Sequence, residues 1–63
     1  MAPIVNYIAD KLGKTYTQVV KEFKREKGLY LYEGKWIEGA YYDVVTQTTV
    51  APVAEIEETL GLL

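Results

Sequence analysis

The sequence contains no cysteine, no histidine and no serine. The lack of cysteine excludes disulfides and thiolate metal sites, and the lack of histidine removes most zinc, copper and iron chemistry. Without these three residue types, no nucleophile–base pair of the usual kind can be assembled. The string KLGKT also lacks the spacing of a phosphate-binding P-loop. We therefore expect a protein that is not an enzyme and that needs no metal or cofactor.

Long hydrophobic runs are absent as well. No apolar stretch approaches the roughly 18 residues that a transmembrane helix requires. The first residues, MAPIVNYIADK, lack the basic start and the long apolar stretch of a secretory signal. We therefore expect a cytoplasmic protein with no membrane partner.

Length and composition limit the core. With 63 residues, 49% of them hydrophobic and 25% charged, the chain is expected to form one globular domain, residues 1–63. A chain of this size buries only about 60% of its unfolded surface, and such domains usually add a disulfide, a metal or a partner subunit. Of these reinforcements, a homodimer is the one that the composition leaves open.

Charge is distributed unevenly along the chain. The net charge is −2, but residues 1–28 carry six basic and three acidic side chains, whereas residues 29–63 carry one basic and six acidic. Such asymmetry fits a protein with one anion-binding face. It equally fits two helices whose solvated surfaces simply favour Lys and Glu, and both interpretations stay open at this point.

The first half of the chain has the apolar spacing of two helices. A helix over about residues 3–12 would start at Pro3 and end before Gly13, with its apolar stripe formed by Ile4, Val5, Ile8, Ala9 and Leu12. A second helix over about residues 15–27 would begin with a capping box between Thr15 and Gln18 and end at Gly28. Its expected buried residues are Tyr16, Val19, Val20 and Phe23.

The second half favours strands followed by a helix. Strands are expected over about residues 29–33 and 36–50, joined by a two-residue turn at Gly34-Lys35, with a possible bulge at Gly39. Residues 41–50 either continue the second strand or bend into a third. A final helix over about residues 52–60 would begin at Pro52. The predicted fold class is α+β: two N-terminal helices, a β-hairpin or three-stranded meander, and a C-terminal helix.

One segment carries the strongest functional signal. A helix-turn-helix unit needs a small residue where its helices touch, a Gly four residues later and a branched aliphatic six residues after that; here these are Ala9, Gly13 and Val19. Residues 5–24 thus resemble the helix-turn-helix of Cro-like repressors. The order helix, helix, hairpin, helix, with LYLYEGKWI as a wing, is similar to winged domains of the excisionase and MerR-like kind.

This resemblance implies a small DNA-binding regulatory protein of phage, plasmid or archaeal-virus type, acting as a homodimer on double-stranded DNA. The second helix would enter the major groove with Thr17, Gln18 and Lys21 facing the bases. Phosphates would be held by Lys14, Lys24, Arg25 and Lys27, and the flanking backbone by Lys35 at the wing tip.

Aromatic residues support an alternative class of function. Five of them lie within residues 30–42: Tyr30, Tyr32, Trp36, Tyr41 and Tyr42. They could stack on unpaired bases or, more simply, pack across strands. Since Tyr and Trp are favoured interface anchors, the alternative is a protein-interaction module that binds or inhibits a host or partner protein. The apolar residues Val44, Val45, Val50, Leu60, Leu62 and Leu63 belong either to the core or to a subunit interface.

Overall fold

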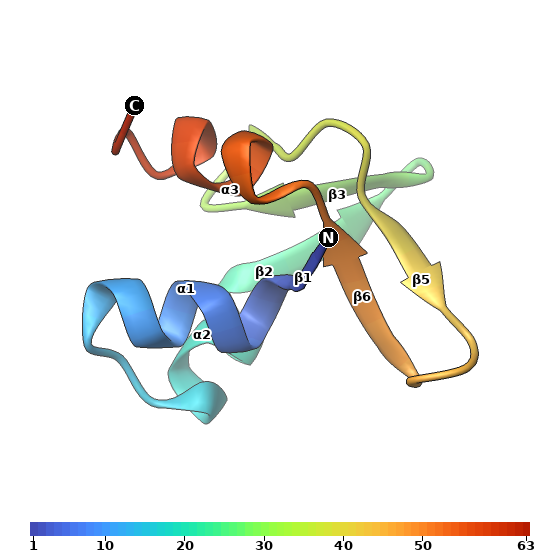
Figure 1. Ribbon diagram of the computed structural model, residues 1–63, viewed down its shortest axis with the longest axis horizontal. Coiled ribbons are helices and arrows are strands. Elements are labelled where there is room, and N and C mark those ends of the chain that lie inside the picture. Colours follow the sequence, from blue (N-terminus) through green and yellow to red (C-terminus); the bar gives the residue numbers. More distant parts are fainter.

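The computed structural model describes all residues, 1–63, and confirms the α+β class. Its elements follow the order β1 (Ala2–Pro3), α1 (Ile4–Leu12), α2 (Tyr16–Glu22), β2 (Phe23–Glu26), β3 (Leu29–Tyr32), β4 (Lys35–Trp36), β5 (Tyr41–Asp43), β6 (Thr48–Ala51) and α3 (Val53–Thr59). The strands form two antiparallel sheets, with orders β1-β6-β5 and β2-β3-β4 (Figure 1). None of the helices combines the length and apolar character needed to cross a membrane.

Helix α1 forms as its apolar spacing predicts, with a small shift at its start. Pro3 caps the helix from an extended conformation, and with Ala2 it pairs with β6 instead of opening the helix. Gly13 ends α1 in the left-handed conformation, and its N–H bonds to the carbonyl of Ala9. The Tyr7 hydroxyl donates to Glu57, which fastens α1 to α3.

Helix α2 begins as predicted but ends earlier. The capping box between Thr15 and Gln18 is formed in both directions. The helix stops at Glu22, however, and the prediction of a helix to residue 27 is wrong: residues 23–26 form β2, paired with β3. Lys27 and Gly28, with φ of 53° and 80°, make the two-residue turn between these strands.

Burial explains why the strand replaces the helix. Of the expected apolar stripe of α2, only Val19 is buried, while Tyr16 and Val20 remain 54% and 45% exposed. A longer helix would therefore bury little more. The hairpin instead sets Phe23 opposite Tyr32, which is buried in the core.

The remaining strands differ from the prediction in register and number. The turn between β3 and β4 is Glu33-Gly34, not Gly34-Lys35, because Tyr32 pairs with Lys35. Residues 36–50 do not form one strand: β5 and β6 make a hairpin, so the chain bends into further strands. The carboxylate of Asp43 stabilises its turn by accepting from the Val45 N–H at 2.9 Å. Gly39 lies in a turn and not in a bulge.

The core lies between the helices and the two sheets. It joins Ile4, Val5 and Ile8 of α1 to Val19, Tyr32, Ile37, Ala51 and Ile56. Helix α3 contributes Ile56; it begins at Val53, one residue later than expected, because Pro52 caps it from outside. Val44, Val45, Leu62 and Leu63 are exposed, whereas Val50 is buried and Leu60 packs against the core.

The sheet β2-β3-β4 has two faces with different environments. Directly paired residues of antiparallel strands share a face, so Phe23 and Arg25 lie with Tyr30 and Tyr32. We call this the inner face, because Tyr32 and Phe23 pack there on the core that the helices build. The opposite, outer face carries Lys24, Glu26, Leu29, Leu31 and Trp36.

Candidate nucleic-acid interface

Three polar side chains fasten α2 to the sheet. The Lys14 ammonium lies 3.0 Å from Glu22 Oε2 and 3.1 Å from Oε1. The Tyr32 hydroxyl donates to Glu22 Oε1 at 2.7 Å and accepts from Lys14 at 3.3 Å. The turn between α1 and α2, the end of α2 and the end of β3 are therefore held together at one point.

Electrostatics in this cluster keep both ionised partners charged. Hydrogen bonds to Glu22 and then to Tyr32 raise the pKa of Lys14. The hydrogen bonds from Tyr32 and Lys14 lower the pKa of Glu22, and burial followed by the bond to Glu22 raises the pKa of Tyr32. Lys14, predicted to hold a phosphate, is thus engaged in an ion pair, and the charge of Glu22 is compensated locally.

Helix α2 presents its predicted base-facing residues to solvent. Thr17, Gln18 and Lys21 are all exposed. The Gln18 carbonyl oxygen already accepts from the Thr15 N–H at 2.9 Å, which leaves its amide N–H₂ as the free end. A bidentate contact to adenine uses both ends of the side chain, so the capping bond competes with it.

The β2–β3 hairpin separates the basic residues of its strand. Arg25 lies on the inner face with its guanidinium 5.6 Å from the centroid of the Tyr30 ring, which stacks in turn on Phe23 at 6.0 Å. Lys24 lies on the outer face opposite Leu31. Lys27 occupies the turn at the far end of the hairpin, which runs away from α2 (Figure 1). The hairpin that protrudes is therefore β2–β3, whereas the sequence placed the expected wing on β3–β4.

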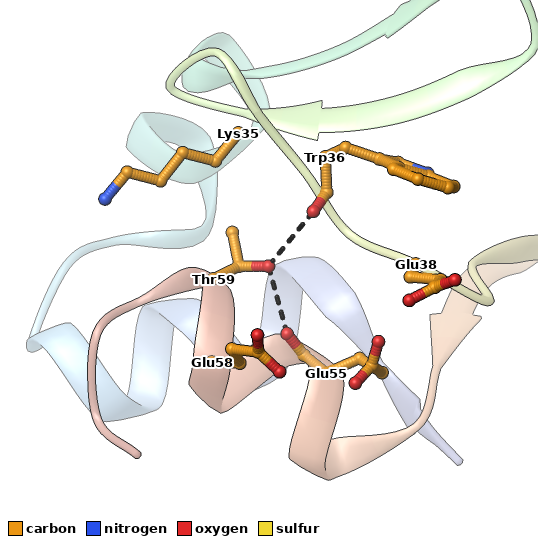
Figure 2. Close-up of a pocket in the computed structure, with 6 residues that line it drawn as sticks. All are labelled: Lys35, Trp36, Glu38, Glu55, Glu58 and Thr59. Atoms are coloured by element: carbon orange, nitrogen blue, oxygen red, sulfur yellow. Dashed lines mark hydrogen bonds between the residues drawn. The ribbon is translucent and has the colours of Figure 1, made fainter.

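Lys35 directly follows the β3–β4 turn and does not lie on the protruding β2–β3 hairpin. It opens β4, at the other end of β3 from Lys27, and lines a cavity of about 280 Å³ between β4 and α3. The cavity is acidic, because Glu38, Glu55 and Glu58 also line it (Figure 2). Burial, then the charges of Glu58 and Glu38, raise the pKa of Glu55. Such a surface repels phosphate.

A hydroxyl group lies between the two elements that border the acidic cavity. Thr59 Oγ1 lies 3.0 Å from the carbonyl oxygen of Glu55 and 3.3 Å from that of Trp36, so its single proton is shared between the two, and the bond to Trp36 links α3 to β4 (Figure 2). No group of carboxylates in the structure is arranged to hold a metal ion.

The structure thus brings together part of the predicted site. Thr17, Gln18 and Lys21 lie on α2, which contacts the inner face of the β2-β3-β4 sheet through Glu22; Arg25 lies on that face, and Lys27 lies in the turn at the tip of the hairpin. Lys14, Lys24 and Lys35 lie in other environments. The sequence analysis missed the Glu22–Tyr32 contact; no short-range spacing signals it, because ten residues separate the two. Comparisons with protein-family models, curated proteins and solved structures give no match.

Proposed function

We propose that the protein is a small, non-enzymatic regulatory protein that binds double-stranded DNA through α2 and the β2–β3 hairpin. One observation carries the proposal. Lys21, Arg25 and Lys27 are exposed, and of the two carboxylates in residues 21–27, Glu22 is paired with Lys14. The segment therefore keeps an uncompensated positive charge that attracts the phosphate backbone.

The local architecture supports this role. A tight turn closed by Gly13 joins α1 to α2, and Val19 anchors α2 in the core while its other side stays exposed. The helix has seven residues, and an α-helix with its side chains is about 10–12 Å across, which a major groove about 12 Å wide can admit. Lys21 at the end of α2, Arg25 and Lys27 then follow one another along the hairpin as phosphate contacts.

The acidic residues favour one orientation on DNA. Glu38, Glu55 and Glu58 gather at the cavity between β4 and α3. Phosphates repel this region, so the protein approaches with α2 and the wing leading.

Fluorescence anisotropy of a labelled random-sequence duplex tests the proposal. If Lys21, Arg25 and Lys27 each replace a counterion, the log–log salt slope is about −2.7, and affinity falls about 40-fold between roughly 50 and 200 mM salt. The variant Lys21→Glu should bind more weakly, with a slope near −2. Lys11→Glu, the same charge change on α1, should bind like wild type, because Lys11 lies outside the proposed contact.

Absence of binding at low salt, or equal losses for Lys11→Glu and Lys21→Glu, would overturn the proposal. A protein-interaction module is then the second candidate, favoured by the exposure of Leu29 (41%) and Trp36 (53%) on the outer face. An interface anchored by these side chains would depend little on salt.

A further inference from the structure

The outer face of the β2-β3-β4 sheet is apolar at its centre and lies outside the core. Leu31 lies between Lys24 of β2 and Trp36 of β4, and Leu29 lies beside Glu26. None of these residues packs on the core cluster, and Leu29 and Trp36 are exposed. In Figure 2 the indole of Trp36 points away from the side chain of Lys35, as expected for neighbours in a strand.

The charges on this face are arranged in a self-complementary way. Lys24 and Leu31 form one cross-strand row, and Glu26 and Leu29 form the next. Consider a second copy laid face to face on the first and related to it by a rotation of 180°. The rotation axis lies in the plane between the two sheets, runs perpendicular to the strands and passes between the two rows. Lys24 of each copy then lies over Glu26 of the other, and Leu31 lies over Leu29.

We propose that a second copy of this chain covers the outer face through this twofold arrangement. A twofold interface uses the same patch on both subunits. Two residues that the rotation places over one another must therefore carry opposite charges, and Lys24 and Glu26 do so. The two leucines supply apolar contact, and Trp36 is the kind of side chain that anchors interfaces. The arrangement of charged and apolar side chains on the outer face therefore indicates a second copy of this chain as the partner.

The size of the core gives the dimer a physical reason. Only nine of the 63 residues are buried, and domains of this length commonly add a subunit interface to a limited core. The outer face is also the side opposite α2 and Arg25. The dimer neither rests on DNA binding nor blocks the proposed DNA-binding surface.

Analytical ultracentrifugation of the full chain tests this interface, over concentrations up to about 1 mM because a patch this small gives a weak dimer. Wild type should sediment as a concentration-dependent dimer. Lys24→Glu and Glu26→Lys should each weaken dimerisation at least about tenfold, since each places like charges over one another twice. The double variant Lys24→Glu/Glu26→Lys should restore it, because both ion pairs re-form with reversed polarity.

Matched controls exclude a general effect of charge. Lys21→Glu on α2 and Asp10→Lys on α1 make the same changes of charge away from the outer face and should dimerise like wild type. Trp36→Thr, a polar residue suited to a strand, should weaken the dimer with an unchanged circular dichroism spectrum. A wild type that stays monomeric, or a double variant as weak as the single ones, would overturn the proposal. Neither result depends on the DNA titration.

Discussion

The turn at Lys27-Gly28 allows a sharp test of where α2 ends. In the structure Lys27 has φ of 53°, a left-handed conformation that costs an ordinary L-residue roughly 1–2 kcal/mol. Asparagine tolerates this conformation better, and Asn-Gly is the preferred sequence for a turn with two positive φ values. We expect Lys27→Asn to raise the free energy of unfolding by about 0.5–1 kcal/mol, roughly half the strain.

The sign of the stability change caused by Lys27→Asn distinguishes a hairpin from a helix at this position. If α2 continued to residue 27, as the sequence favours, the same substitution would lower stability by a few tenths of a kcal/mol, because asparagine has a lower helix propensity than lysine. Thermal unfolding followed by circular dichroism measures the difference, since about 1 kcal/mol shifts the midpoint of a domain this small by about 4–8 °C.

Lys21→Asn provides the matched control. Lys21 lies in the last turn of α2, so this variant should lose stability by roughly 0.5 kcal/mol. Opposite shifts for the two variants would support the hairpin. A decrease for Lys27→Asn similar to that for Lys21→Asn would refute the boundary at Glu22.

Two further predictions follow from the backbone and the charges. Gly39→Ala should destabilise more than Gly28→Ala: φ is near 80° at both, but an added Cβ at Gly39 would lie 3.2 Å from Pro52 Cδ, whereas at Gly28 it would contact nothing within 4 Å. Chemical denaturation measures the free energy of unfolding of both variants. Equal losses of stability would show that Pro52 moves aside without cost. Glu22 has a folded-state pKa below its ordinary value of 4.5, so its contribution is present above pH 4.5 and disappears as the pH falls through the lower, folded pKa. Glu22→Gln should therefore reduce the midpoint of thermal unfolding more at pH 7 than at pH 2, and a reduction independent of pH would contradict the ion pair.

Local sequence signals predicted the start of α2 and the end of α1, whereas α1 and α3 each begin one residue later than predicted. The capping box at Thr15 and the stop at Gly13 depend on side chains and backbone within four residues of one another, and both form in the structure. The apolar stripe of α1 is likewise local, and it supplies Ile4, Val5 and Ile8 to the core. Such signals are independent of what packs against the helix.

Predictions of structure that depends on pairing between distant parts of the sequence were wrong. KEFKREKG reads as a helix end because Lys, Glu and Arg are good helix formers and Gly is a common stop. Its structure is decided instead by pairing with LYLY, whose strand preference the sequence showed without indicating a partner. The same pairing makes β2–β3 a hairpin, whereas the sequence predicted a single hairpin, the expected wing, at β3–β4.

The candidate site was predicted as a set of residue types but not as a surface. Exposure of Thr17, Gln18 and Lys21 follows from the helical spacing, and the structure agrees. The positions of Lys14 and Lys35 depend on tertiary neighbours: an ion pair with Glu22 for the first and an acidic cavity for the second. A lysine shows its charge in the sequence, but not which carboxylates will surround it.

The change from helix to strand at Phe23 has a consequence for how the two proposed surfaces work together. On a helix, Lys24 and Arg25 would lie about 100° apart, whereas on a strand they point to opposite faces. Arg25 can then contact DNA while Lys24 pairs with a second copy. In the proposed dimer the outer faces are joined, so the two proposed DNA-binding surfaces point in opposite directions and one straight duplex cannot reach both. Breaking the dimer with Lys24→Glu should therefore change the affinity for a long and for a short duplex by the same factor, whereas Arg25→Glu should lower both affinities without changing dimerisation. A loss confined to the long duplex for Lys24→Glu would contradict the face-to-face arrangement.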